Sequence, residues 1–395
     1  MNTILFTLCV PPSVEPVVEK FFGDIAASCK PFLNVKILTT YPNSNIWQAS
    51  SIDYSPTVLC AEPFVAKLPP ASLTDFLTSQ LSLWAEHHWP GDPYGIEHLR
   101  KIYKFFENEV DQSENMSAIF TWQSQSLYST LLRSIATDRG IPFYSVERGW
   151  LPHTLMVDIG RNTFFSETNL SFIKREAPTL TEKERAQFQV NMSLRNCDRY
   201  EDINTKSSKP QPNKVVFFNH GEPHFSFAGN AQQRLAHHHN LSQIGTIVET
   251  VNNYCLKNQL NFAVQEHPFN REGLFNLSSV YPNICNSNES VKEIFESQHT
   301  SLFTHSTLQF QSVLSGCKTA LLSRGPLSGW IPELQHHSSV EKFLNHFLKT
   351  PAESYLNPAV DYIYDLYKKF LIDIEPTSYE QSVNVFSKKI RNLFQ

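Results

Sequence analysis

The chain has 395 residues, a formal net charge of −5, 41% hydrophobic residues and 18% charged residues. This length is too great for one ordinary hydrophobic core and fits two α/β domains. The composition excludes an intrinsically disordered chain, and the slightly acidic net charge argues against a broad nucleic-acid-binding face.

The first half of the chain predicts alternating strands and helices, the pattern of a parallel sheet with right-handed crossovers. Short apolar runs favour strands, and longer runs with apolar residues at helical spacing favour helices. Strands are expected over residues 4–10, 34–41, 57–61, 117–123 and 143–146, and helices over residues 14–28, 73–88, 94–110, 127–139 and 180–201. The strand at 143–146 leads into a loop that begins with Glu147. We expect this loop at the carboxyl edge of the sheet, where open α/β sheets bind their ligands.

The second half repeats this organisation after a polar linker that contains proline, at residues 206–213. A strand is expected at 215–218 and a helix at 242–257, and three later apolar runs end at His267-Pro268, Ser306-Thr307 and Arg324. Proline cannot continue a strand ladder, and Ser and Thr are natural N-cap residues for a following helix. Each run therefore predicts a strand that delivers polar groups to the carboxyl edge of a second sheet.

Three helices are expected at the end of the chain, over residues 340–348, 359–371 and 379–394. The last helix is amphipathic and slightly basic. We expect it to dock on the N-terminal domain, with contact to anionic lipid as the alternative.

Several common site types lack their sequence signatures. The chain has no G-x-G-x-x-G, Walker A or G-x-S-x-G motif, which disfavours dinucleotide oxidoreductases, P-loop NTPases and α/β-hydrolases. The seven cysteines are scattered without a C-x-x-C pair, which indicates reduced thiols. Neighbouring histidines at 237–239 would point in different directions on a helix, so no metal site is expected. No apolar run reaches the ~20 residues of a membrane span, and the N-terminus has no signal-peptide features, so a cytoplasmic location is expected.

Together these features predict an α/β chain with two doubly wound, Rossmann-type domains that face each other across a cleft. This is a GT-B-like arrangement, typical of enzymes that use nucleotide sugars, and the C-terminal helices pack back in it. Residues 1–205 are expected to form an N-terminal acceptor-binding domain, 206–213 the linker, 214–350 a nucleotide-sugar-binding domain and 351–395 the C-terminal helices.

Three motifs, in order along the chain, resemble those of a known family. Glu147-x-Gly149-x-x-Pro152 resembles the Glu-x-Gly-Tyr-x-x-Pro signature of the bacterial capsule polysaccharide biosynthesis proteins, which include Kdo-transferring glycosyltransferases. His267-Pro268 is similar to the His-Pro motif of this family, and Ser306-Thr307 to its Asn-Ser-Thr segment. The resemblance covers residues 117–326.

The resemblance implies a GT-B fold, a CMP-activated Kdo donor and an acceptor held by the N-terminal domain. It also implies a carboxylate nucleophile after the first strand of the C-terminal domain. Glu222 is the best match, although the family has Asp at this place. A second departure is Gln265, where many relatives carry Lys.

The candidate catalytic residues are Glu147, as general acid/base for the acceptor hydroxyl, and Glu222, as the nucleophile. A capping or surface carboxylate is the alternative for both. The candidate donor-binding residues follow the predicted strands of the second half: Asn219, His220, Gln265, His267, Pro268, Ser306, Thr307 and Arg324. The candidate acceptor-binding residues are Trp122, Gln123, Arg148, Gly149, Trp150 and Asp158, with core packing as the alternative for the two tryptophans.

The sequence therefore predicts a glycosyltransferase that moves a Kdo-like sugar from a CMP donor to a glycan or glycolipid acceptor, with retention at the anomeric carbon. No metal or other cofactor is expected, nor a nucleic-acid partner, and peripheral association with the inner membrane stays open. One alternative is a transferase or epimerase that uses a UDP- or GDP-sugar. The other is a non-catalytic partner protein of glycan assembly.

Overall fold

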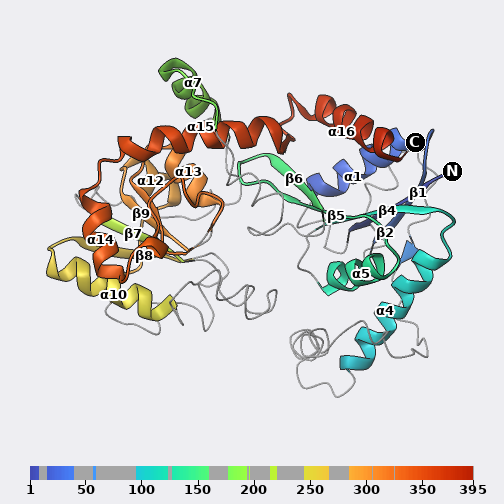
Figure 1. The fold of residues 1–395 in the computed structure, drawn as a ribbon, viewed down its shortest axis with the longest axis horizontal. Coiled ribbons are helices and arrows are strands. Elements are labelled where there is room, and N and C mark those ends of the chain that lie inside the picture. Colours follow the sequence, from blue (N-terminus) through green and yellow to red (C-terminus); the bar gives the residue numbers. More distant parts are fainter. Residues whose placement is uncertain are drawn as a thin grey trace. The chain divides into compact units, whose positions relative to one another are not determined.

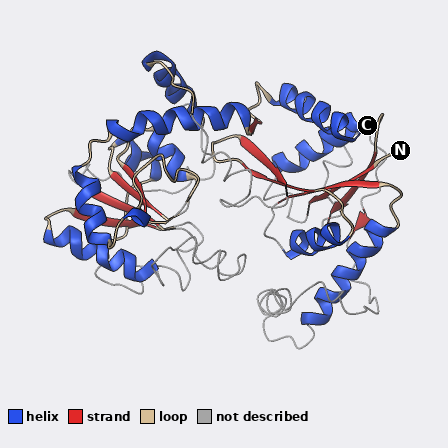
Figure 2. Cartoon of the chain, viewed as in Figure 1, coloured by secondary structure: helices blue, strands red, loops and turns tan. Residues whose placement is uncertain are grey.

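The computed structural model of the protein describes residues 1–8, 16–39, 57–58, 95–122, 127–159, 177–193, 195, 214–219, 244–266, 284–304, 306–323 and 325–394. The chain divides into two compact units, each with its own sheet and helices (Figures 1 and 2). The first unit contains Met1–Gly149, Thr154–Thr168 and Ile372–Gln395, and the second contains Trp150–His153 and Asn169–Leu371.

The first unit is built on a seven-stranded sheet in the order β11-β6-β5-β4-β1-β2-β3. Its strands are β1 (Thr3–Leu8), β2 (Asn34–Thr39), β3 (Thr57–Val58), β4 (Met116–Trp122), β5 (Phe143–Arg148), β6 (Thr154–Ile159) and β11 (Leu371–Asp373). Strands β1 to β5 are parallel, and β6 runs antiparallel to β5. The chain winds from β1 outward to β3 and then returns to the other side of β1. The topological switch point therefore lies between β1 and β4.

Helices cover both faces of the first sheet, as a doubly wound fold requires. Helices α1 (Pro16–Cys29) and α16 (Tyr379–Phe394) share a core with Phe6 and Leu8 of β1. Helices α4 (Gly95–Asp111) and α5 (Leu127–Asp138) share a core with Leu5 on the opposite face. Because alternate strand residues point to opposite faces, continuous apolar runs such as that of β1 suit a sheet covered on both sides.

The final helix, α16, packs back on the first unit as the sequence predicts. Phe386 of α16 stacks on Phe21 of α1, with ring centroids 5.7 Å apart, and meets Phe120 of β4 edge-on at 6.3 Å. The Tyr379 hydroxyl also donates a hydrogen bond to Asp24 of α1 over 2.8 Å. The end of the chain thus completes the core that its beginning starts.

The second unit is built on a four-stranded parallel sheet in the order β10-β9-β7-β8. Its strands are β7 (Lys214–Phe218), β8 (Asn261–Gln265), β9 (Thr300–Phe303) and β10 (Thr319–Leu321). Its helices include α7 (Glu182–Ser193), α10 (Ile244–Lys257), α12 (Val291–Glu296), α13 (Leu308–Leu314), the 3-10 turn η2 (Leu334–His336), α14 (Val340–Lys349) and α15 (Glu353–Lys369). The first strand, β7, lies between β8 and β9, so the switch point of this sheet lies between β7 and β9.

Helix α7 belongs to the second unit, although the sequence predicts it within an N-terminal domain that ends at residue 205. Arg185 of α7 forms a bidentate pair with Asp361 of α15, with nitrogen–oxygen distances of 2.6 and 3.0 Å. Phe188 of α7 meets Tyr364 edge-on with ring centroids 5.2 Å apart. These contacts attach α7 to α15, so the first unit ends earlier in the chain than the sequence suggests. The expected linker at 206–213 and the expected helix at 73–88 lie outside the described residues.

Two strands differ from the expectation. The sequence predicts a loop after residue 146, whereas β5 continues to Arg148 and β6 returns antiparallel to it. The sequence also extends the penultimate helix to residue 371, whereas α15 ends at Lys369 and Leu371 begins β11. Both strands lie at one edge of the first sheet, where pairing with a neighbour decides the structure of short segments. Among the helices in the part of the chain that the structure describes, none combines the length and apolar character of a membrane span.

The packing of α16 predicts a specific loss of stability. We expect Phe386→Ala to destabilise the protein by about 3–5 kcal/mol, because the change removes a ring that contacts Phe21 and Phe120 in the core. Val385 is 49% exposed on the same helix, so Val385→Ala should change stability by less than about 0.5 kcal/mol. Thermal unfolding of the full chain measures both. Equal effects of the two variants would show that α16 does not complete this core.

Candidate functional site

The Glu-x-Gly segment forms a β-hairpin that joins β5 to β6. The Gly149 amide donates a hydrogen bond to the Thr154 carbonyl over 2.7 Å, and His153 adopts a left-handed φ of 53° in the turn. A Cβ atom on Gly149 would lie 2.0 Å from Thr154 Oγ1 and 3.0 Å from its carbonyl carbon. Glycine is therefore required here by close approach of the two strands. Glu147 and Arg148 are the last two residues of β5, and not part of a loop beyond it.

Strand register places two candidate carboxylates on one face of the first sheet. Ser145 pairs with Asp158, and Glu147 follows Ser145 by two residues. Paired residues, and residues two apart on one strand, share a face of a sheet. Glu147 and Asp158 are therefore diagonal neighbours on the face that α4 and α5 cover. The structure places Asp158 within a strand, where its Oδ1 accepts a hydrogen bond from the Ile159 amide over 2.8 Å.

A row of buried polar side chains crosses this face near the carboxyl edge. The register joins Thr7 of β1, Thr121 of β4, Ser145 of β5 and Asp158 of β6. All four side chains are buried. The Thr121 hydroxyl lies 2.8 Å from the hydroxyl of Ser129 in the first turn of α5. Four polar residues in an otherwise apolar sheet face indicate a polar site beneath the start of α5.

The two candidate tryptophans are both buried, but in different units. Trp122 is the last residue of β4. Trp150 lies in the second unit, where its ring stacks on Phe310 with centroids 5.3 Å apart and contacts Phe370 in a tilted arrangement at 5.7 Å. Aromatic stacking of this kind contributes to the core, so Trp150 does not present an open ring to a sugar.

Register also aligns polar residues at the carboxyl edge of the second sheet. Gln265 pairs with Phe218, and Phe218 pairs with Phe303, so these three residues end their strands in one row. The next row contains Glu266, Asn219 and Thr304, one residue beyond each strand. We call this set the Glu266–Asn219–Thr304 row.

Hydrogen bonds order this row. The Asn219 side-chain amide donates to Glu266 Oε2 over 2.6 Å, and the Asn219 backbone amide donates to the Gln265 carbonyl over 2.9 Å. The Ser323 hydroxyl donates to the Thr304 carbonyl. The strand ladder thus continues past its formal end. Asn219 and Thr304 follow β7 and β9, the two strands on either side of the switch point, where doubly wound sheets bind ligands. Glu266 follows β8 and reaches this place through its hydrogen bond with Asn219.

Two polar atoms at this edge have no hydrogen-bond partner among the described residues. Thr304 is 0% exposed, and its hydroxyl is unpartnered. Gln265 is also buried, and its Oε1 atom is unpartnered. A buried polar group without a partner costs about 1–3 kcal/mol, so each such group calls for an explanation. Because Gln265 and Thr304 belong to adjacent rows, their side chains point to opposite faces of the sheet. A ligand on the face of Thr304 would satisfy the Thr304 hydroxyl.

At the start of α13, Ser306 makes a side-chain hydrogen bond to the helix backbone and Thr307 makes no capping bond. Ser306 is buried, and its Oγ atom accepts a hydrogen bond from the Leu308 amide over 3.2 Å. Thr307 occupies the N-cap position, but its side chain makes no capping hydrogen bond. The capping function that the sequence assigns to the pair is therefore provided by Ser306.

Six predicted site residues lie outside the described residues: Gln123, His220, Glu222, His267, Pro268 and Arg324. Conversely, sequence reasoning missed Glu266 and Thr304. Each is the first polar residue after an apolar strand, and that position was the available signal. Within the described ranges, no group of three or more His, Cys, Asp or Glu side chains is placed to hold a metal ion.

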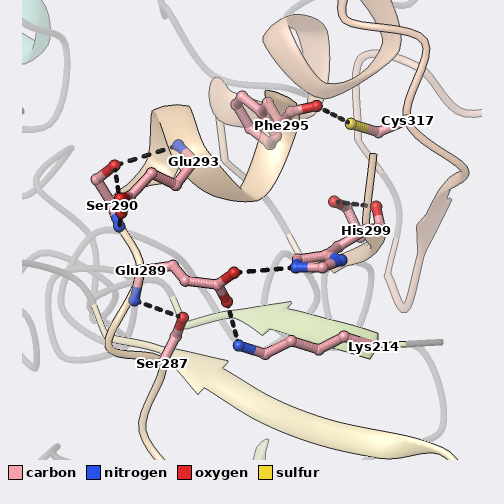
Figure 3. A network of polar contacts seen from close by, with 9 residues as sticks. Lys214, Ser287, Glu289, Ser290, Glu293, Phe295, His299 and Cys317 are labelled. Atoms are coloured by element: carbon pink, nitrogen blue, oxygen red, sulfur yellow. Dashed lines mark hydrogen bonds and ion pairs between the residues drawn. The ribbon is translucent and has the colours of Figure 1, made fainter. Parts of the chain in front are cut away.

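A second polar network lies at the opposite, amino-terminal edge of the second sheet. Lys214 begins β7, His299 immediately precedes β9, and Figure 3 shows Glu289 between their side chains. Glu289 Oε2 pairs with Lys214 Nζ, and Glu289 Oε1 lies 3.1 Å from His299 Nε2. All three residues are buried. Burial alone raises the pKa of Glu289, but the bonds to Lys214 and His299 outweigh it and hold the pKa below its usual range. This network ties β7 and β9 to the segment before α12.

The chain is similar over nearly its whole length to several solved structures. A glycosyltransferase from Rickettsia africae ESF-5 is 8% identical with a TM-score of 0.39, over 100% of this chain and 99% of that chain. The MnaA–UDP co-structure from S. aureus is 9% identical with a TM-score of 0.36, over 91% of each chain. Arabidopsis thaliana UGT89C1 complexed with UDP is 12% identical with a TM-score of 0.36, over 99% and 100%. At these values the likeness carries over no activity. No protein-family model and no curated protein sequence matches the chain.

The hairpin geometry predicts that Gly149 tolerates no side chain. We expect Gly149→Ala to destabilise the first unit, because the new methyl group would overlap Thr154. Overpacking of this kind typically costs about 1–3 kcal/mol. Gly325 is the matched control, since its Cβ would meet only ordinary contacts, the nearest being Gln309 Oε1 at 3.4 Å. Chemical denaturation of both variants provides the test, and a Gly149→Ala protein as stable as Gly325→Ala would refute the close approach.

The amino-terminal network predicts a pH-dependent contribution to stability. The folded-state pKa of Glu289 lies below its ordinary value of 4.5. Its stabilisation is therefore complete above this value and is lost as the pH falls through the folded pKa. At neutral pH, Glu289→Gln should cost about 3–5 kcal/mol, because Lys214 stays buried without its counter-charge.

The free-energy gap between wild type and Glu289→Gln should narrow in acid. Urea unfolding at a series of pH values measures it, with exposed Glu296→Gln as the control variant. A gap that is constant from neutral to acid pH would contradict an ionised Glu289 in the folded state.

Proposed function

We propose that the protein is a glycosyltransferase that uses a nucleotide-activated sugar. The donor binds at the carboxyl edge of the second sheet, and the acceptor binds at the carboxyl edge of the first. The observation that carries this proposal is the Glu266–Asn219–Thr304 row, which lies beside a topological switch point and includes a buried hydroxyl without a partner among the described residues.

The chemistry of this row suits the hydroxyl groups of a ribose. A carboxylate accepts hydrogen bonds, and in doubly wound folds an acidic residue commonly binds the ribose in this way. Glu266 has this chemistry, and the Thr304 hydroxyl both donates and accepts. His267 and Pro268 follow Glu266 in the chain, and Ser306 follows Thr304 by two residues. We propose that these neighbours bind the phosphate of the donor, together with Asn219, His220, Thr307 and Arg324.

The motif resemblance extends the proposal to the donor and the reaction. The donor is a CMP-activated, Kdo-like sugar, and Glu222 attacks its anomeric carbon while the bond to the CMP phosphate breaks and its electron pair leaves on the phosphate. The acceptor hydroxyl oxygen then displaces Glu222, and its proton passes to the Glu147 carboxylate. Two displacements retain the anomeric configuration. Asp158 shares the sheet face of Glu147, which supports an acceptor site on the first unit.

A panel of nucleotides tests the donor assignment by thermal shift. A ligand present at 100 times its Kd stabilises the folded protein by about 2.7 kcal/mol. We expect CMP and CTP to raise the Tm. Selective stabilisation by UDP or GDP would instead support a transferase or epimerase for those sugars. Failure of all four nucleotides to shift the Tm would contradict the proposal and favour a non-catalytic glycan-assembly partner.

Replacement of Thr304 separates a binding role from a structural one. Thr304→Val keeps the shape and removes a buried hydroxyl without a described partner, so stability should stay unchanged or rise. Nucleotide affinity should fall roughly tenfold, the value of one good hydrogen bond. Thr319 is the matched control, because its buried hydroxyl bonds to Ser312 and to the Cys317 carbonyl.

Thr319→Val should therefore show the reverse pattern, with lower stability and unchanged affinity. Calorimetric titration with CMP and thermal unfolding together measure both variants. A Thr304→Val protein that binds CMP as well as the wild type would remove Thr304 from the donor site.

A further inference from the structure

Glu19 is a buried carboxylate that the proposed reaction does not use. It lies in the first turn of α1, its side chain is 0% exposed, and neither carboxylate oxygen has a hydrogen-bond partner among the described residues. Burial raises the pKa of this carboxyl above its usual value. An acidic side chain in the first turn interacts favourably with the helix dipole. This stabilisation is smaller than the free-energy cost of burying an unpartnered carboxyl group. Its presence in the core therefore needs another explanation.

Helix and strand geometry place Glu19 at the carboxyl end of β1. Phe22 of α1 contacts Phe6 of β1, with ring centroids 5.4 Å apart. The helix runs antiparallel to β1, because it returns the chain to the start of the parallel strand β2. Glu19 is three residues before Phe22, or about 4.5 Å along the helix. Leu8 is two residues after Phe6, or about 6.6 Å along the strand. Glu19 therefore lies at about the height of Leu8 along β1.

Trp122 is the neighbour of Leu8 on the next strand. Thr7 pairs with Thr121, so the following residues, Leu8 and Trp122, lie side by side on the face that α1 covers. Trp122 is 2% exposed, and its indole Nε1 has no hydrogen-bond partner in the described part of the chain. Two buried polar groups without partners among the described residues thus lie at the carboxyl edge of the first sheet, on the same face as α1 and next to the switch point between β1 and β4.

We propose that Glu19 and Trp122 form a binding pocket for a hydroxyl group of the glycan acceptor. A sugar hydroxyl both donates and accepts, so it can accept from the indole N–H and donate to the Glu19 carboxyl oxygen. One ligand group would thereby satisfy both orphaned partners. This inference rests on the proposed function, since it assigns the acceptor to the first unit. It differs from the polar row beneath α5, which lies on the opposite face of the same sheet.

The experiment combines sugar binding with stability. Saturation-transfer NMR with a panel of methyl hexopyranosides reports binding to the full chain, and thermal unfolding reports stability. Glu19→Leu should leave the protein at least as stable as the wild type, because an unpartnered carboxyl is removed. The same variant should weaken glycoside binding roughly tenfold or more, whereas Glu19→Gln, which still accepts a hydrogen bond, should retain part of it.

A pH series supplies a readout that does not depend on the glycoside. Because burial raises the folded-state pKa of Glu19, wild-type stability should decline as the pH rises from 4.5 through that pKa. Glu19→Gln should lack this decline. If Glu19→Leu fails to fold, Trp122→Phe serves as the second variant, since it removes the N–H with little change in shape.

Three results would overturn the pocket: no saturation transfer to any methyl hexopyranoside in the wild type, unchanged transfer in Glu19→Leu and Trp122→Phe, or a marked loss of stability in a folded Glu19→Leu protein. The last would show that Glu19 has a structural partner. Nucleotide binding at the second sheet is measured separately by CMP titration. A protein that binds CMP but no glycoside refutes this pocket while the donor site stands.

Discussion

The parallel hydrogen-bond ladder that joins β7 to β8 on one side and to β9 on the other sets the geometry of the candidate donor site. This ladder places Gln265, Phe218 and Phe303 in one row, so that Glu266, Asn219 and Thr304 emerge together beyond it. Three residues that are far apart in sequence become neighbours only through this register. The buried Lys214–Glu289–His299 network ties the amino-terminal ends of β7 and β9, so both ends of β7 are held in place.

Strand register also decides which side chains become neighbours in the first sheet. Its register lines up Thr7, Thr121, Ser145 and Asp158 on one face and brings Leu8 beside Trp122 on the other. The polar row lies beneath α5, and the proposed acceptor pocket lies beneath α1. Tight packing of the β5–β6 hairpin against Gly149 holds Glu147 and Asp158 in this frame. A side chain at Gly149 would disturb the positions of both carboxylates.

The amino-acid sequence predicts the central strands of both sheets better than it predicts the edge strand β6 or the unit to which α7 belongs. Buried parallel strands appear as short apolar runs, so β1, β4 and β7 are visible in the sequence, and so is the packing of the last helix on the first unit. Strand β6 is missed because it follows a turn with proline and depends on its pairing with β5. The sequence does not indicate that α7 joins the second unit, because α7 is polar by composition and its placement depends on tertiary contacts such as that of Arg185 with Asp361.

Site residues follow the same division. Asn219 and Gln265 are predictable because they end apolar runs, whereas Glu266 and Thr304 become candidates only when the register aligns them. In the sequence, Glu19 looks like an ordinary acidic residue of a first helical turn, where a negative charge interacts favourably with the helix dipole. Its complete burial depends on the packing of α1 against the sheet, which composition and periodicity do not contain.

The most direct test of the account is a crystal structure of the protein soaked with CMP. The account predicts nucleotide density at the carboxyl edge of the second sheet, with a ribose hydroxyl within hydrogen-bonding distance of Glu266 or Thr304. Density at the amino-terminal edge beside Lys214, or at neither edge of this sheet, would contradict it.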